Sequence, residues 1–144
     1  MEPLDLTKRA PRSPWDQLAG AYMLPRTIDK LRALLPGGNV GAYRIPGFSE
    51  GLLRVIGCTE DELRDVVARA NGDDDVAAWV SPRLDREKLA RYNERVSTRR
   101  LADLDDPEDF FTRYPIARNM PKDRTLFDML LEDDVQTLAG RTPG

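Results

Sequence analysis

The sequence predicts an all-α protein: a single compact domain of about six to seven short-to-medium helices, joined by loops rich in proline and glycine. Apolar residues recur at helical spacing in most segments, and no strand-like alternation extends beyond a few residues. Eleven prolines and ten glycines separate these segments at short intervals. The 144 residues suffice for one core without metals or disulfides. We expect a flexible arm at 1–12, the helical domain at 13–136 and a loose tail at 137–144.

The first two helices are expected on either side of Pro25. Ser13 and Pro14 have the pattern of an N-cap followed by proline at the first helical position. Pro25 is expected to interrupt or kink the helix that they begin. A second apolar stripe then runs as far as Pro36-Gly37-Gly38. The apolar positions are Trp15, Leu18 and Tyr22 in the first helix, and Ile28, Leu31, Leu34 and Leu35 in the second.

Three short helices are expected in the middle of the chain. The first, at 49–56, follows a Gly- and Pro-punctuated loop and stops at Gly57. Thr59 and Glu62 have the spacing of a capping box that starts the second helix, which Asn71-Gly72 ends. The buried positions of this second helix are Leu63, Val66, Val67 and Ala70. The third helix carries Val76, Ala77 and Val80 beside Trp79, with Asp73 or Asp74 as its cap.

The remaining helices follow the same signals. Ser81-Pro82 repeats the cap-and-proline pattern and is expected to open the longest helix, which ends near Arg100. Asp106 starts a further short helix that Pro115 closes, and residues 126–131 form a last buried helix. Their apolar positions are Leu89, Tyr92, Val96, Phe110, Phe111, Leu126, Phe127, Met129, Leu130 and Leu131.

Composition limits the chemistry that the chain can perform. Twenty-two Lys and Arg stand against 25 Asp and Glu, an acidic balance that argues against a nucleic-acid partner. The absence of histidine excludes His-containing zinc sites and Ser-His-Asp triads, and we expect neither a metal nor a cofactor. The single cysteine, Cys58, cannot form an internal disulfide, which suits a reducing compartment. Because neither a signal peptide nor a membrane span is visible, we expect a cytoplasmic protein.

The strongest candidate site is the charged segment that follows Pro25. Helical spacing brings Arg26 close to Asp29 and Lys30, and Asp29 close to Arg32. Three cations against one carboxylate leave positive charge beside the proline, where the free N–H groups of a helix start would favour an anion. The alternative is a solvated face whose intrahelical ion pairs contribute only about a few tenths of a kcal/mol each.

In the first interpretation the segment holds a small anionic molecule, in a binding protein or a small enzyme. Arg26, Lys30 and Arg32 would contact the anion, and Asp29 would orient them. Tyrosine and tryptophan often line small-molecule pockets because they combine an apolar body with a polar tip. The further lining residues expected here are Tyr22, Tyr43, Trp79 and Asn93.

A second hypothesis is a helical protein–protein interaction module without catalytic activity. The long helix carries a basic stripe, formed by Lys88, Arg91, Arg95 and Arg99, in an otherwise acidic protein. The stripe would dock an acidic partner, or a second copy of the chain in a homo-oligomer. Acidic residues are interleaved with it, so a solvated, ion-paired face is the alternative.

Two other features are interpreted as structural. Residues 52–68 have the spacing of a DNA-binding helix-turn-helix, but the acidic first turn of the second helix would repel phosphates. Cys58 precedes a helix N-cap, a position that favours a thiolate, yet the chain has no histidine to act as its base. We therefore expect packing roles for both.

A set of short motifs points to a family. Ser13-Pro14 is followed by Leu18-Ala19-Gly20 and then by Arg26-x-Ile28-Asp29-Lys30-x-Arg32, and the series continues at 43, 56–59, 75–79, 92–93 and 125–128. This series resembles an uncharacterised bacterial family of small helical proteins that is classed as a domain of unknown function. The resemblance covers most of residues 13–135, with departures at 24–25 and 106–121. It implies a compact helical cytoplasmic protein and carries over no established activity. Its polar positions favour the ligand-binding hypothesis: Arg26, Asp29, Lys30 and Asn93.

Overall fold

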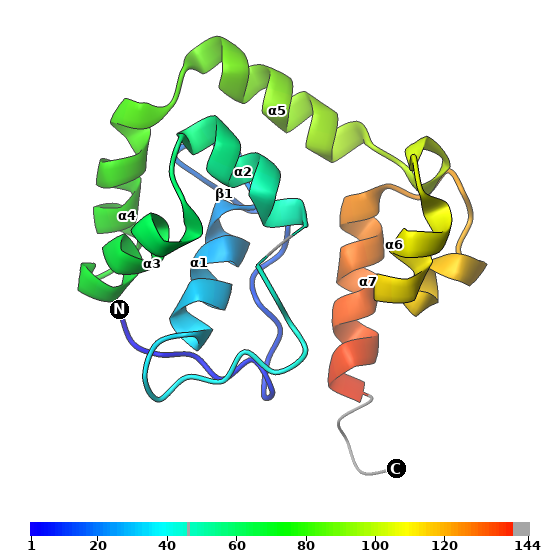
Figure 1. The fold of residues 1–144 in the computed structure, drawn as a ribbon, viewed down its shortest axis with the longest axis horizontal. Helices are drawn as coiled ribbons and strands as arrows, with labels where there is room; N and C mark the ends of the chain where they lie inside the picture. Colours follow the sequence, from blue (N-terminus) through cyan, green and yellow to red (C-terminus); the bar gives the residue numbers. More distant parts are fainter. Residues whose placement is uncertain (46, 140–144) are drawn as a thin grey trace.

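A computed structural model describes residues 1–45 and 47–139, and over these residues the chain is mostly helical (Figure 1). The α-helices are α1 (Leu24–Ala33), α2 (Phe48–Ile56), α3 (Glu60–Arg69), α4 (Asp73–Val80), α5 (Arg86–Thr98), α6 (Pro107–Arg113) and α7 (Leu126–Ala139). The 3-10 helices are η1 (Ser81–Arg83), η2 (Leu101–Asp103) and η3 (Pro115–Asn119). The only strands in the described ranges are β1 (Gln17–Leu18) and β2 (Ala21–Tyr22). The predicted helical class is therefore confirmed.

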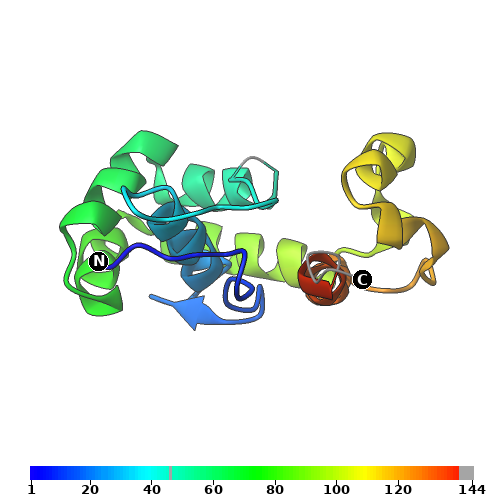
Figure 2. The same ribbon diagram turned by 90° about the horizontal axis from the view of Figure 1, so that it is seen from below.

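Helix α1 lies at the centre of the molecule. In Figure 1, α5 crosses above α1 and α2, with α3 and α4 at one end and α6 and α7 at the other. Figure 2 shows α2 on one side of α1 and the β-hairpin on the opposite side. Every residue of α1 except Arg32 is buried, including Arg26, Asp29 and Lys30. Because buried charges are costly without partners, other elements must supply them.

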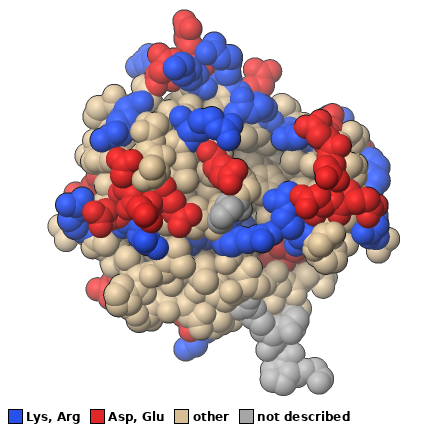
Figure 3. Space-filling model, in the orientation of Figure 1, with Lys and Arg blue, Asp and Glu red and all other residues tan. Residues whose placement is uncertain are grey.

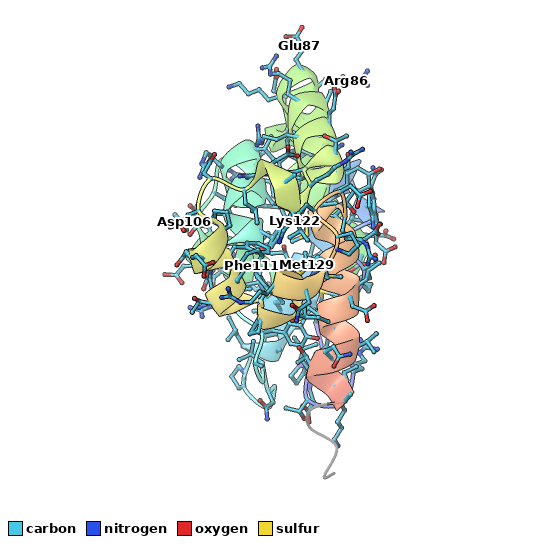
Figure 4. The ribbon with its side chains drawn as sticks, turned by 90° about the vertical axis from the view of Figure 1, so that its right-hand side faces the viewer. Arg86, Glu87, Asp106, Phe111, Lys122 and Met129 are labelled. Atoms are coloured by element: carbon cyan, nitrogen blue, oxygen red, sulfur yellow. The ribbon has the colours of Figure 1, made fainter. Side chains whose placement is uncertain are left out.

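Helix α7 joins the end that contains α6 and η3 to the rest of the molecule. Its start is tied to the chain that follows α5, since Leu126 donates its backbone N–H to the Arg99 carbonyl at 2.9 Å. Figure 4 views this end and shows Phe111 and Lys122, whose Nζ lies 4.5 Å from the ring centroid. From there α7 runs alongside the region of α1, which places its carboxylates near the buried cations of that helix.

The helix expected over 13–22 is wrong, because this segment forms the β-hairpin. Strands β1 and β2 pair antiparallel across Ala19 and Gly20, which have positive φ angles of 53° and 76°. Such angles suit a two-residue hairpin turn. The side chain of Asn93 on α5 fixes the hairpin: its oxygen accepts from the Tyr22 N–H at 3.2 Å, and its amide donates to the Gly20 carbonyl at 2.7 Å. Contacts with a residue 71 to 73 positions away in sequence thus override the local helical spacing.

The aromatic residues that suggested a helical face form a cluster instead. Trp15, Tyr22 and Phe127 pack edge to face, with ring centroids 5.0 to 5.9 Å apart. The indole N–H of Trp15 also donates to Asp128 at 3.0 Å. The hairpin is therefore anchored to the first turn of α7.

Pro25 begins a helix rather than interrupting one. Met23 precedes α1 with a left-handed φ of 75°. Pro25 lies in the first turn, where a backbone N–H would have no partner within the helix, so the lack of one costs nothing. The helix ends at Ala33, so the expected stripe is too long: Leu34 is 37% exposed and Leu35 is half-buried.

Several predicted helix ends are confirmed. The capping box is formed, since Thr59 Oγ accepts from the Glu62 N–H and the Glu62 carboxylate accepts from the Thr59 N–H, both at 3.1 Å. Gly57 ends α2 in the left-handed conformation, with φ 79°. Asp106 caps α6 by accepting from the Asp109 N–H. These signals are local, so no distant contact is needed to produce them.

Two expected helix starts are wrong. Ser81 and Pro82 continue α4 as the 3-10 helix η1, and Asp85 caps α5 by accepting from the Lys88 N–H at 2.9 Å. Gly72, rather than Asp73 or Asp74, precedes α4. Helix α5 is also not the longest, because its 13 residues are exceeded by the 14 of α7.

The two chain ends are the segments expected to form a flexible arm and a loose tail. Residues 1–12 pack along the domain: Leu6 is fully buried and donates its N–H to the Asn39 carbonyl at 2.8 Å. The flexibility of this segment stays a prediction. Helix α7 includes 137–139, while 140–144 lie outside the described residues. Over the described chain, no helix is long and apolar enough to cross a membrane.

Candidate functional site

The charged residues of α1 point to two different places. Arg26 and Lys30, four residues apart, face α7 and the loop before α2, whereas Asp29 and Arg32 face the N-terminal segment and α4. The predicted Arg26–Asp29 ion pair is not formed. The single corner expected from the sequence is therefore two separate sites.

Arg26 and Lys30 line a cavity of about 180 Å³. We call it the α1–α7 cavity. Its other lining residues come from the loop before α2, from the end of α6 and from α7: Ala42, Tyr43, Arg44, Arg113, Tyr114 and Leu130.

Arg26 forms a buried, bidentate ion pair with Asp134 of α7. Two guanidinium nitrogens donate to the two carboxylate oxygens, each at 2.8 Å, and Tyr43 donates its hydroxyl to the same carboxylate at 3.1 Å. The Arg26 Nε atom is buried and has no hydrogen-bond partner among the described residues. This pair holds α7 against α1, and it neutralises one of the cations around the cavity.

Lys30 is a buried charged group of the cavity that has few partners. Its side chain is buried, at 6% exposure, and within the described chain Nζ donates to a single acceptor, the Arg44 carbonyl, at 3.1 Å. Burial, together with the nearby Arg26 charge, lowers the pKa of Lys30 to about 7. The amine is therefore poised to be neutral or charged near physiological pH.

Two exposed arginines stand at the mouth of the cavity. Arg113 pairs with Asp109 at 3.2 Å, and no carboxylate in the described chain lies within ion-pairing distance of Arg44. In Figure 3, Lys and Arg side chains form a band that runs from the centre of this face toward α6 and α7. The nearby carboxyl of Asp133 has a raised pKa, mainly because it is partly buried and also because it lies beside Asp134. The cavity therefore has an excess of positive charge.

The second site is a structural ion-pair network. Buried Asp29 accepts hydrogen bonds from the Arg12 N–H at 2.8 Å and from its guanidinium at 3.1 Å, while Arg32 lies 3.9 Å away. Arg12 also pairs with Asp73, and its guanidinium lowers the pKa of that carboxyl. A hollow of about 730 Å³ lies beside the network, but acidic residues from 73–75 line it as well as cations. These contacts join the N-terminal segment to α1 and α4.

The other predicted lining residues lie elsewhere. Tyr22 and Asn93 belong to the hairpin and its anchor. Trp79 on α4 stacks with Arg83, whose guanidinium carbon is 3.9 Å from the ring centroid. Of the eight candidates, only Arg26, Lys30 and Tyr43 line the α1–α7 cavity.

Sequence reasoning missed four residues of this site. Arg113, Tyr114 and Asp134 are far from α1 in the sequence and carry no local motif. Arg44 follows Tyr43 directly, so its neighbour was the only available signal.

Cys58 has no feature of a nucleophile. Its thiol is partly buried, and burial together with the nearby Glu62 charge raises its pKa. A raised pKa disfavours the thiolate that nucleophilic chemistry requires.

The basic stripe borders a shallow groove between α2 and α5. We call it the α2–α5 groove; it has a volume of about 280 Å³ and is lined by Gly51, Arg54, Val55, Lys88, Arg91, Tyr92 and Arg95. Among the described residues, no carboxylate lies within ion-pairing distance of Arg54, Lys88, Arg91 or Arg95. Arg99 continues the stripe and pairs with Asp105 at 3.8 Å. The ion pairing expected along α5 is thus absent over most of the stripe.

Comparison with known proteins agrees with the motif series found in the sequence. A search of the curated proteins finds no match. The family model described as "Domain of unknown function (DUF5069)" matches residues 8–136, which is most of the chain. The chain therefore belongs to the DUF5069 family.

Proposed function

We propose that this protein binds a small anionic molecule in the α1–α7 cavity, as a binding protein or as a small enzyme. The observation that carries the proposal is Lys30: a buried amine with one hydrogen-bond acceptor, in a cavity whose mouth bears two exposed arginines. A buried amine with spare donors, beside guanidinium groups, is stabilised by an anion that supplies acceptors and negative charge. The lone cysteine and the resemblance to bacterial proteins support a bacterial, cytoplasmic setting.

The volume of the cavity sets the size of the ligand. At about 180 Å³ it is smaller than the roughly 300–1,000 Å³ of sites for drug-sized ligands. Inorganic phosphate or a short-chain carboxylate matches this space, whereas a nucleotide does not. Tyr114 adds a hydroxyl group that suits an oxygen-rich ligand.

The test is native mass spectrometry of protein freshly purified from its own host, followed by calorimetry with phosphate and acetate. We expect a small adduct, and binding that weakens at least about tenfold in Arg113→Ser. The matched control is Arg118→Ser, because Arg118 is also exposed and also pairs with a carboxylate of α6, but lies outside the cavity. A clean apo mass together with no anion binding would refute the proposal.

The unpaired cations of the α2–α5 groove favour a second candidate function, the docking of an acidic protein segment. Exposed cations without internal partners leave their charge available to a binding partner. Binding of a glutamate-rich peptide, measured by fluorescence anisotropy, should be lost in the triple variant Lys88→Glu, Arg91→Glu, Arg95→Glu. Arg64→Glu on α3 is the control, because Arg64 is exposed but already pairs with Asp61. Equal peptide affinity in the triple variant and the control would remove this candidate.

A further inference from the structure

We infer that Lys30 is a nucleophilic amine that condenses with the carbonyl group of a small, anionic aldehyde or keto acid held in the α1–α7 cavity. This inference rests on the anion binding proposed above and names the class of molecule that the same site would take. It adds a covalent step to what is otherwise a binding cavity.

The position of the amine supports this role. Lys30 lies in the middle of α1, a helix held on all sides, so its backbone is fixed by the core of the protein. The side chain is buried yet lines a cavity, and its only acceptor among the described residues is the Arg44 carbonyl. No carboxylate pairs directly with Nζ among the described residues. The described contacts therefore leave this buried amine without the pairing that usually accompanies a buried lysine.

The surroundings favour the neutral form that a nucleophile requires. Arg26 carries a positive charge close to Nζ, and Arg44 adds a second, which together with burial disfavours the ammonium ion. Asp133 and Asp134 act in the opposite direction, but the Asp134 carboxylate is held by Arg26 and Tyr43. Desolvation beside other cations is a known way to activate a lysine amine.

Two arginines at the cavity mouth select the substrate. The guanidinium groups of Arg44 and Arg113 stand at the cavity mouth and suit a carboxylate, which they would hold with charge-assisted hydrogen bonds. A carbonyl carbon adjacent to that carboxylate then lies further inside, toward Lys30. An α-keto or α-aldehyde acid places these two groups next to each other.

The condensation balances without any added reagent. The lone pair of the Lys30 nitrogen forms a C–N bond with the carbonyl carbon, and the carbonyl π electrons move to oxygen. This oxygen takes one of the two amine protons, which gives a carbinolamine. Its hydroxyl group leaves as water with the second amine proton, and the nitrogen and carbon then share a double bond. One amine and one carbonyl compound give one imine and one water.

The experiment is reductive trapping of the full chain with glyoxylate and sodium cyanoborohydride. Labelling is followed by intact mass and by peptide mapping. The chain has four lysines, and the other three, Lys8, Lys88 and Lys122, are exposed and provide an internal reference. At pH 7.5 we expect Lys30 to be labelled at least about tenfold faster than Lys122, because burial in the cavity lowers the pKa of Lys30 and favours its neutral, nucleophilic amine.

Three variants sharpen the test. Lys30→Met should remove the fast label and leave the slow labelling of the exposed lysines unchanged. Arg113→Ser should slow the labelling of Lys30, whereas Arg118→Ser should not. Acetaldehyde, which has no carboxylate, should label Lys30 no faster than Lys122. Equal rates for acetaldehyde and glyoxylate at Lys30 would overturn the assignment of an anionic substrate.

The outcomes separate this inference from the binding proposal. If Lys30 reacts no faster than Lys122 while calorimetry still detects anion binding, the amine is not a nucleophile and the cavity only binds. If both labelling and anion binding are absent, the binding proposal fails as well. Circular dichroism of each variant establishes that a lost signal does not come from unfolding.

Discussion

The α1–α7 cavity and the α2–α5 groove both gather positive charge, but they hold it in different ways. In the cavity, Arg26 and Lys30 are buried on a central helix and depend on partners from distant parts of the chain. In the groove, Arg91 and Arg95 are exposed on the surface of α5, and water supplies their hydrogen bonds. The same residue types are therefore structural and reactive in one place, and solvated in the other.

This difference determines how each region responds to mutation. Removing one member of a buried pair leaves the other charge without a partner in a medium that solvates it poorly. Removing an exposed cation changes little in the folded state, because water replaces what is lost. Charge alone does not distinguish the two regions; burial does.

The largest effect is expected for Asp134→Ala. This change leaves the Arg26 guanidinium buried without its carboxylate, and should reduce the free energy of unfolding by about 3–5 kcal/mol. The double variant Arg26→Met, Asp134→Leu removes both charges and should be more stable than Asp134→Ala. Urea unfolding monitored by circular dichroism measures both. A loss below about 1 kcal/mol in the single variant would contradict the importance of the pair.

Arg12→Ala should have the next largest effect. Asp29 is fully buried and would lose the guanidinium of Arg12, although it also accepts from a backbone N–H that remains. We expect a loss of about 2 kcal/mol in the free energy of unfolding. Arg9→Ala serves as the control, since Arg9 borders the same hollow and is exposed. Similar losses in the two variants would show that the Asp29 network contributes no more than surface charge.

Lys30→Met should change how stability depends on pH. The folded-state pKa is about 7 and the unfolded value is 10.5, so the unfolded chain binds a proton that the folded chain lacks between these values. Stability therefore rises with pH across this window, by up to about 1.4 kcal/mol per pH unit, and the contribution of Lys30 is flat below pH 7.

The variant should lose this slope, while Lys122→Met, at an exposed lysine, should keep it. Chemical unfolding at pH 7, 8, 9 and 10 provides the comparison. Besides burial, the charges around Lys30 set its pKa: Arg26 and Arg44 lower the pKa, whereas Asp134 and Asp133 raise it. An unchanged slope in Lys30→Met would mean that the amine stays charged in the folded protein.

The smallest effect is expected in the groove. Arg91→Ala and Arg95→Ala should each change the free energy of unfolding by less than about 0.5 kcal/mol, because neither forms an ion pair within the described chain. Thermal unfolding at low and high salt checks this. A loss of more than about 1 kcal/mol would show that the groove contributes to the core, and would remove the contrast between the two regions.

Local signals account for what the sequence predicted correctly. The capping box at Thr59, the left-handed Gly57 and the cap at Asp106 depend on contacts within a few residues, so their patterns specify them directly. The helix predicted over 13–22 was wrong for the opposite reason, because distant contacts decide its structure. Its apolar spacing fits a helix, but Asn93 and Phe127 stabilise a hairpin from far along the chain.

The candidate site shows the same division. The sequence placed Arg26 and Lys30 close together, because their spacing on a helix is a local property. It also placed Asp29 with them, although the central position of α1 turns that carboxylate toward Arg12. Three other residues were predicted to line the pocket only because their residue types often do so: Tyr22, Trp79 and Asn93. No local sequence pattern specified where these side chains would lie.

By itself, the sequence determined that the chain is helical, where several helices begin and end, and that its charged first helix is unusual. These properties depend on periodicity and on caps, which act over one or two turns. Only the tertiary structure decided that this helix is buried at the centre, that Asp134 pairs with Arg26, and that Lys30 is left with a single acceptor in a cavity. The reason is physical: the state of a charged side chain depends on its burial and partners, and both come from segments that meet only when the chain folds.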